Sequence, residues 1–492
     1  MQIKRVLLLA AIVSLLVTLF DVQPAPASAA APYEAYNYDF YGDAVPLPAP
    51  YLPEYAITGK SLGVGDFNQP SDMYVAKDGS VYILDKGNAR VIVLDSSLKV
   101  KQVIADFDNN GKQDVLAGPE GLFVSEKNEI YVADTEHNRV VVLSNDGKLL
   151  KTIESPKSDI LPKDFKFVPL KVTVDSADRV FVVSRGVFEG IMQFDEKSDF
   201  MGYVGTISVS PTLWDRLWRS LSTKAQKQQM ELFIPTEFAS VDIDSKGFVY
   251  ATAIDINSNE TIKRLNPSGQ DVLKRFGYWP VKGDIRFRMF GTNSGPSKLI
   301  DIKVLDGGMY VALDSNRARL FTYNDEGDLL HVFGGRGNQL GVFNNPVAVE
   351  QIGDKLAVLD MGKNNIAVFK PTTFGSLVRE ATIEHYTGND DKAVKLWEQV
   401  LRLNTNYEIA YLGIGKSLLM EKKNKEAMEY FKLGMSRKNY SVAYKRYRRE
   451  VMKDNFGSFM TVLISLIAAF VAYRLARHAI RRRSVKREAG FY

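Results

Sequence analysis

Short apolar runs that alternate with polar positions fill the chain from residue 54 to residue 373, and turn residues separate them. This pattern is typical of β-strands with one buried face. Six prolines open successive groups of three or four such runs, at spacings of 49, 50, 66, 61 and 50 residues. Because each blade of a propeller buries its faces against its neighbours, this period predicts a six-bladed β-propeller. The prolines are Pro70, Pro119, Pro169, Pro235, Pro296 and Pro346.

An aspartate followed five residues later by an arginine recurs in three of these units. An Asp at the end of one strand and an Arg on the next can bridge a β-hairpin, so we predict a structural role for these pairs. With the opening proline and the Asp or Gly turns, the motif resembles the NHL repeat family, which implies a propeller fold. The pairs are Asp85 and Arg90, Asp134 and Arg139, and Asp314 and Arg319.

The two ends of the repeat region complement each other. The sixth unit, residues 346–370, has only three strand-like runs, and residues 54–59 (EYAITG) can supply the fourth. We therefore expect strands from both ends to close the ring and remove its exposed edges. Residues 31–53, which are rich in Tyr, Pro and Ala, predict an extended leader along the propeller.

From residue 374 the apolar period becomes helical, and a second repeat appears with a spacing of 34 residues. Its small and aromatic positions resemble the tetratricopeptide pattern of paired helices over residues 374–454. That resemblance implies a surface for a peptide or protein partner, and a plain stalk between propeller and membrane is the alternative. Ala381, Ala393, Trp397 and Val400 correspond to Gly415, Ala427, Phe431 and Gly434.

Both ends of the chain carry membrane-directed segments. Lys4 and Arg5, an apolar run and a small-residue site predict a signal peptide over residues 1–30, cleaved near Ala29-Ala30; an uncleaved anchor is the alternative. Residues 455–473 contain no charged side chain and are long enough to cross the ~30 Å hydrocarbon core. We predict a transmembrane helix there, with a buried soluble helix as the alternative. A cleaved signal would place the ectodomain outside the cell membrane and the basic tail, residues 474–492, in the cytoplasm.

Composition excludes several classes of protein. The 492 residues contain no cysteine and four histidines, so disulfide frameworks, thiolate metal sites and cysteine nucleophiles are ruled out. The net charge is +5, but the tail contributes +6 and residues 31–473 carry −2, which gives no basic surplus for nucleic acid. The basic residues between 445 and 453 either contact anionic headgroups or envelope polymer, or form a solvated helix face.

Two long insertions, before Pro235 and Pro296, carry three of the four tryptophans. Flat aromatic rings with arginine donors suit a sugar or a protein hot spot, so we predict a ligand-binding face there. Alternatively, the first insertion is a helix that caps the propeller, and its tryptophans belong to the core. The predicted ligand-binding residues are Tyr278, Trp279, Arg286, Arg288, Trp214 and Trp218.

The segment Asp106, Asp108, Asn110, Asp114 places oxygen ligands around a glycine. This spacing resembles the calcium loops of other extracellular propellers and predicts a structural Ca²⁺ site. A turn rich in Asp, Asn and Gly without a metal is the alternative.

No nucleophile elbow, phosphate loop or HExxH motif occurs in the sequence. The repeat register puts Asp72, Glu120, Lys171 and Asp301 at the innermost strands, without a histidine. The leading hypothesis is a membrane-anchored extracytoplasmic binding or scaffold protein. Its parts resemble those of bacterial surface components that accompany transport systems, including carbohydrate uptake, so a membrane partner and a carbohydrate ligand are expected. The alternative is a lactonase-like propeller hydrolase or lyase with a calcium-dependent site.

Overall fold

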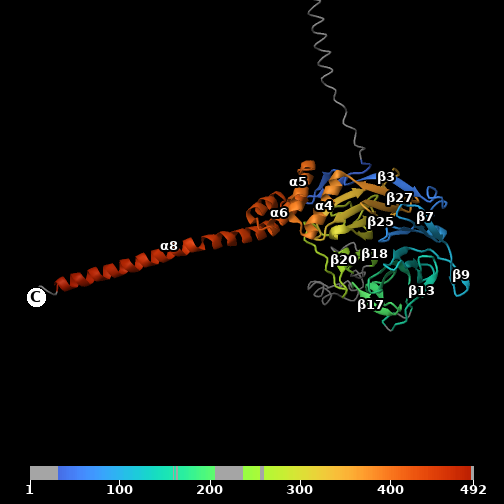
Figure 1. Ribbon diagram of the computed structural model, residues 1–492, viewed down its shortest axis with the longest axis horizontal. Coiled ribbons are helices and arrows are strands. Elements are labelled where there is room, and N and C mark those ends of the chain that lie inside the picture. Colours follow the sequence, from blue (N-terminus) through green and yellow to red (C-terminus); the bar gives the residue numbers. More distant parts are fainter. Residues whose placement is uncertain (1–30, 159, 162–163, 206–236, 255–259, 489–492) are drawn as a thin grey trace, which may run out of the picture.

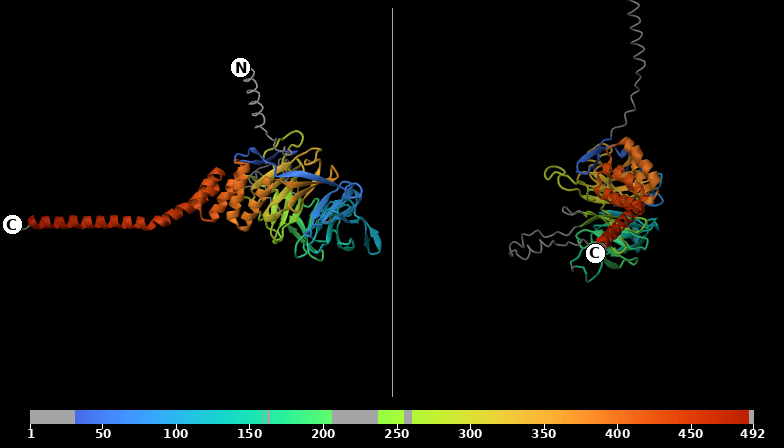
Figure 2. Two further views of the ribbon diagram at one scale, coloured as in Figure 1. Left: turned by 45° about the horizontal axis from the view of Figure 1, so that its top comes forward. Right: turned by 90° about the vertical axis from the view of Figure 1, so that its left-hand side faces the viewer.

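The computed structural model describes residues 31–158, 160–161, 164–205, 237–254 and 260–488. A β-propeller forms the largest part, a group of short helices packs on one side of it, and one long helix extends away from that group (Figures 1 and 2). Trp214, Trp218 and the predicted signal peptide lie outside the described residues.

Six sheets radiate around a central axis, as the repeat period predicts. Their first strands begin within three residues of the opening prolines and contact one another in a closed ring. The first three blades are β4 (Asp72–Val75), β5 (Val81–Asp85), β6 (Arg90–Leu94), β7 (Val100–Ile104); β10 (Gly121–Val124), β11 (Ile130–Asp134), β12 (Arg139–Leu143), β13 (Leu149–Ile153); and β14 (Pro169–Val174), β15 (Val180–Ser184), β16 (Ile191–Phe194), β17 (Phe200–Val204).

The other three blades differ in strand number. The described part of the fourth has three strands, the fifth has six and the sixth has four. They comprise β18 (Phe238–Ile243), β19 (Val249–Ala253), β20 (Ile262–Leu265); β21 (Leu299–Val304), β22 (Tyr310–Asp314), β23 (Arg319–Tyr323), β24 (Leu329–Gly334) with β1 (Ala35–Tyr38) and β2 (Ala44–Leu47); and β25 (Pro346–Ile352), β26 (Lys355–Asp360), β27 (Asn365–Pro371) with β3 (Tyr51–Thr58). Short 3-10 helices occur at Lys86–Asn88 and Asp306–Gly308.

Ring closure follows the sequence prediction. β3 pairs antiparallel with β27, so the sixth blade takes its outer strand from the beginning of the propeller. Buried aliphatic and aromatic side chains form a cluster at each junction between successive blades, and the cluster between the sixth and first blades joins Ile366 to Ile83 and Ile92. Apolar burial therefore stabilises the ring as one unit.

The leader forms a β-hairpin and not only an extended segment. β1 pairs with β2, and Tyr36 lies opposite Val332 of β24, so the hairpin adds two strands to the fifth blade. β2 forms the outer edge, where Pro46 lacks the N–H that a further strand would need.

Five helices follow the propeller: α4 (Thr373–Thr387), α5 (Asp390–Leu403), α6 (Glu408–Met420), α7 (Asn424–Leu433) and α8 (Arg437–Glu488). Neighbouring helices in the chain pack against each other, and α7 begins 34 residues after α5, as the internal repeat requires. A side chain at Gly413 would overlap Trp397, and one at Gly415 would overlap Phe431, so both glycines permit close helix packing. The helical pairs thus follow the predicted spacing.

Helix α8 continues without a break from the helical module into the apolar segment. Among the described residues, Arg437–Arg481 is the one helix that is long and apolar enough to cross a membrane, and its apolar part is unburied. It is compatible with a single-pass membrane anchor.

Candidate ligand groove and central channel

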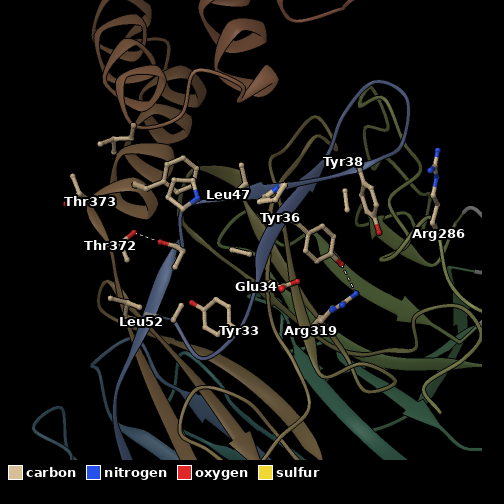
Figure 3. A pocket seen from close by; sticks show the side chains of 18 residues that line it. Tyr33, Glu34, Tyr36, Tyr38, Leu47, Leu52, Arg286, Arg319, Thr372 and Thr373 are labelled. Atoms are coloured by element: carbon tan, nitrogen blue, oxygen red, sulfur yellow. Dashed lines mark hydrogen bonds between the residues drawn. The ribbon is translucent and has the colours of Figure 1, made fainter. Parts of the chain in front are cut away.

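An open groove of about 950 Å³ lies where the leader hairpin, the fifth blade and α4 meet (Figure 3). Its volume falls at the upper end of the range typical of small-molecule sites. The N-terminal residues of α4 and part of the hairpin line one end, and Arg286 and Arg319 lie toward the other. Tyr33, Tyr36, Tyr38, Pro46 and Phe374 give the walls an aromatic and apolar character.

A buried carboxylate organises the arginine end of the groove. Asp284 is 1% exposed, and its Oδ1 accepts hydrogen bonds from the hydroxyls of Tyr36 and Tyr38, the latter at 2.8 Å. Its Oδ2 accepts from Arg319 Nη1 at 2.9 Å and lies 3.3 Å from Arg317 Nη1. Burial and the Asp284 charge raise the pKa of both tyrosines, so both stay neutral donors.

This cluster corrects one sequence expectation. Asp314 and Arg319 stand opposite each other in the strand register, yet the Arg319 guanidinium pairs with Asp284. Asp314 instead accepts backbone amides, including that of Lys298 at 2.7 Å. The insertion before Pro296 brings in a carboxylate that sequence spacing could not place. In the first two blades the expected pairs do form, Arg90 with Asp85 at 2.8 Å and Arg139 with Asp134 at 2.7 Å.

Polar groups suited to a ligand remain in the groove. Glu34 is exposed and has no hydrogen bond or ion pair among the described residues. The central carbon of the Arg319 guanidinium lies 5.1 Å from the centre of the Tyr36 ring. The hydrogen bonds that Arg319 donates to Asp284 and to the Tyr36 hydroxyl both come from Nη1. Arg286 pairs with Asp43 and donates to the Tyr41 carbonyl at 2.9 Å. The groove therefore offers guanidinium donors and a carboxylate acceptor along one wall.

The other predicted ligand residues divide between packing and exposure. Trp279 Nε1 donates to the Asp39 carbonyl at 2.8 Å, and the Tyr278 hydroxyl donates to the Gly434 carbonyl of the helical module. These rings therefore hold the hairpin and the helices against the propeller. Arg288 lies exposed on the same insertion, beside the 89% exposed Phe290.

The predicted calcium loop folds as a hairpin of β8 (Phe107–Asn109) and β9 (Lys112–Asp114). The Gly111 amide donates a hydrogen bond of 2.7 Å to the Asp108 carboxylate. Both terminal nitrogens of Arg139 donate hydrogen bonds to the Asp114 carboxylate, at 2.8 and 3.0 Å. Arg139 holds the pKa of Asp114 well below its usual range. Within the described ranges no group of three or more His, Asp or Glu side chains is arranged to hold a metal ion. Calcium binding by Asp106, Asp108, Asn110 and Asp114 stays a prediction.

The innermost strands carry a second polar cluster, along the propeller axis. Aspartate carboxylates of one blade accept hydrogen bonds from backbone amides of the next blade. The Leu122 amide donates to Asp72, that of Val304 to Asp242 and that of Val349 to Asp301, each at 2.8 Å. These bonds join successive blades at the axis.

Two largely buried lysines, with side chains 13% and 14% exposed, balance part of the negative charge of this axial cluster. Lys171 lies 2.7 Å from Asp72 and 3.7 Å from Asp301, and Lys303 lies 3.0 Å from Glu350 and 3.6 Å from Asp242. Burial raises the pKa of Asp72 to about 6 and that of Glu350 to about 8. Glu120, the fourth residue expected at the innermost strands, pairs with Lys86 at 2.6 Å.

The histidines lie away from this axis. All four are described, and none lines the cavity at the axial cluster. Ser417 and Asp390 both approach Nδ1 of His385, at 3.2 and 3.0 Å, whereas a catalytic triad uses the two different ring nitrogens. Ser417 is also fully buried.

Sequence reasoning missed Tyr36, Tyr38, Asp284 and Glu34. In the sequence Tyr36 and Tyr38 stand out only as part of a Tyr-rich leader, and they lie 248 and 246 positions from Asp284, respectively. No local spacing signals such a contact.

Comparison with known proteins agrees with the fold. Residues 67–94 and 116–143 match the NHL repeat model, and these ranges hold the three inner strands of each of the first two blades. No curated protein sequence matches the chain significantly. The chain therefore contains NHL repeats within a six-bladed β-propeller.

Solved propeller structures resemble it only distantly. Virginiamycin B lyase from Staphylococcus aureus is 12% identical with a TM-score of 0.39, over 62% of this chain and 80% of that one. A structural genomics protein from Bacteroides thetaiotaomicron is 10% identical with a TM-score of 0.40, over 69% and 76%. A streptogramin B lyase is 11% identical with a TM-score of 0.36, over 68% and 85%. At these values the likenesses define neither an activity nor a ligand.

Proposed function

We propose that this protein is a membrane-anchored binding and scaffold protein whose groove takes an uncharged polar ligand of the oligosaccharide class. In this proposal α8 crosses the membrane and holds the ectodomain on its extracytoplasmic side. The helical module contacts a membrane partner such as a carbohydrate transporter. The observation that carries it is the position of the groove, at the junction of the leader hairpin, the propeller and the helices that lead into α8.

The contacts at this junction support a rigid unit. Met309 and Leu330 of the propeller share one hydrophobic cluster with Phe374 and Tyr407 of the helical module. Tyr407 donates a buried hydrogen bond of 2.7 Å to the Leu330 carbonyl. Such a unit would hold a bound ligand at a constant position relative to the anchor.

The charges of the groove favour an uncharged ligand over a phosphate or other anion. Arg286 and Arg319 are each neutralised by an aspartate, so they contribute directional N–H donors and little net positive charge. The unpaired Glu34 adds a negative charge and two acceptor oxygens. Sugar hydroxyls accept from guanidinium groups, donate to carboxylates and pack against aromatic rings.

A thermal-shift screen of the full chain in detergent against neutral oligosaccharides tests this proposal. A ligand that binds the folded state raises the melting temperature with its concentration. We expect Glu34→Gln to keep the melting temperature of the free protein and to lose most of the ligand-induced shift. Glu398→Gln, an exposed position on α5, serves as the matched control and should keep the full shift. If every neutral oligosaccharide fails to shift the wild type, the ligand class is wrong; an equal shift in Glu34→Gln would place the site elsewhere.

The lactonase or lyase alternative receives less support. Asp72, Asp242 and Asp301 are engaged in backbone hydrogen bonds that join the blades. A general base at the axis would have to come from carboxylates that already join the blades, and Asp72 and Asp242 also face the ammonium groups of Lys171 and Lys303.

A further inference from the structure

The first four turns of α8 have two different faces. With about 100° between successive residues, Lys445, Arg448, Arg449 and Lys453 fall within an arc of about 140°. All four are exposed. The buried Ala443, which packs on the module, and the acidic residues Glu450 and Asp454 lie on the opposite side. We call the four basic residues the basic stripe.

The stripe is electrostatically uncompensated. None of its four members forms an ion pair within the described part of the chain, whereas Arg446, at the edge of the arc, donates to the Leu419 carbonyl at 3.3 Å. Lys438, about two turns before Lys445 on the same face, has its ammonium 4.6 Å from the centre of the Phe276 ring. An unpaired row of long cationic side chains is suited to an anionic surface.

The continuous helix determines where this row lies relative to a bilayer. The uncharged segment begins at residue 455, so Lys453 lies about 3 Å and Lys445 about 15 Å from its start at 1.5 Å per residue. The polar interface of a bilayer extends about 5–8 Å beyond the hydrocarbon on each side. Lysine and arginine side chains can bridge the remaining distance because their charged ends extend away from the helix. Figure 1 shows that this part of α8 leaves the helical module and points away from the propeller.

We propose that the basic stripe binds anionic phospholipid headgroups in the leaflet that faces the ectodomain and thereby sets the tilt of the whole ectodomain. This inference rests on the membrane anchoring of the proposed function and is independent of the groove and its ligand. Each lysine or arginine near an anionic surface strengthens binding about fivefold, so four of them define a strong preference over zwitterionic lipid. Because module and propeller share one core, a preferred orientation of α8 would also orient the groove.

The test reconstitutes the full chain into nanodiscs that contain phosphatidylcholine alone or mixed with phosphatidylglycerol. Since the chain has no cysteine, Ser441→Cys on the stripe face supplies a single site for a fluorophore. We expect headgroup quenchers to reduce its emission more in phosphatidylglycerol discs, and high salt to remove the difference. Mass spectrometry of the co-purified lipid should show phosphatidylglycerol enrichment that falls at least fivefold when the four stripe residues are changed to glutamine.

A variant with Lys99, Lys101 and Lys112 changed to glutamine is the matched control, since these exposed residues lie in the first blade and the β8–β9 hairpin, far from α8 (Figure 1). It should keep both the quenching and the lipid enrichment. Equal enrichment in the stripe variant would overturn the inference, as would binding of soluble polyglycerol phosphate through the stripe without any preference for phosphatidylglycerol. A chain that does not enter the nanodisc would refute the membrane anchoring of the proposed function. A chain that enters but shows no lipid preference would refute only the role of the basic stripe.

Discussion

Lys416 of α6 provides the sharpest test of how the helical module is held on the propeller. Its ammonium group lies 2.9 Å from Asp328 and also contacts Glu326, and both carboxylates belong to the loop before β24. The Lys416 side chain is 16% exposed and that of Asp328 only 2%. Burial acts to lower the pKa of Lys416, but the charges of Asp328 and Glu326 outweigh it and raise the pKa, so Lys416 is charged at neutral pH.

Replacing Lys416 with methionine keeps the length of the side chain and leaves two carboxylates without their cation. Removing one partner of a buried ion pair costs about 3–5 kcal/mol, and the partial exposure of Glu326 places the expected loss near 3 kcal/mol. Hydrogen exchange of the α6 amides in the full chain measures the opening free energy of this region directly. We expect K416M to lower it by that amount.

Lys392→Met is the control for this experiment. Lys392 also pairs with a glutamate, Glu384, but its side chain is 65% exposed, so water replaces the lost partner. We expect its α6 exchange to match that of the wild type. If K416M and K392M behave alike, the buried ion pair does not hold the module, and the junction between propeller and helices is not rigid.

Three further predictions concern other regions. Gly375→Ala should destabilise the contact between α4 and the segment before β3 by about 1–3 kcal/mol in urea unfolding, because the new Cβ would lie 2.0 Å from the Pro50 carbonyl oxygen; an unchanged midpoint would contradict this. Burial raises the pKa of Glu350 from its ordinary value of 4.5 to about 8, so the wild type loses stability as the pH rises between these two values and loses no more above them; Glu350→Gln should nearly match it at pH 5 and exceed it at pH 9, and a pH-independent difference in melting temperature would disprove the assignment. Calcium should raise the melting temperature of the wild type and leave Asp108→Asn unshifted, and titration calorimetry without heat would end the calcium prediction for the β8–β9 hairpin.

The position of the groove supports the proposed function. The groove is made by three segments that are far apart in the chain, and two of them, the leader hairpin and the beginning of α4, flank the propeller in sequence. Thr372 caps α4 and also donates to the Ala49 carbonyl at 2.6 Å, so the chain segments that enter and leave the propeller meet beside the groove (Figure 3). A ligand bound there would contact both the propeller and the helices that lead to α8.

The repeat of prolines and Asp–Arg pairs determined the number of blades, their boundaries and the closing role of residues near 54–59, because each blade is a local unit whose strands are neighbours in the chain. The uncharged stretch near the C-terminus likewise predicted the apolar part of α8, since length and composition alone decide whether a helix can cross a bilayer. The same locality explains why the Asp85–Arg90 and Asp134–Arg139 pairs could be anticipated from spacing.

Only the tertiary structure decided the contacts of Tyr36, Tyr278, Trp279 and Arg319. Tyr278 and Trp279 carry the residue types of a binding face, but they pack the helices and the hairpin onto the propeller. Arg319 stands opposite Asp314 in register, yet Asp284 and Tyr36 from distant segments draw it into the groove. Contacts between such segments depend on how insertions fold back over the blades, and the energy of each contact is set by burial, which one-dimensional spacing does not contain.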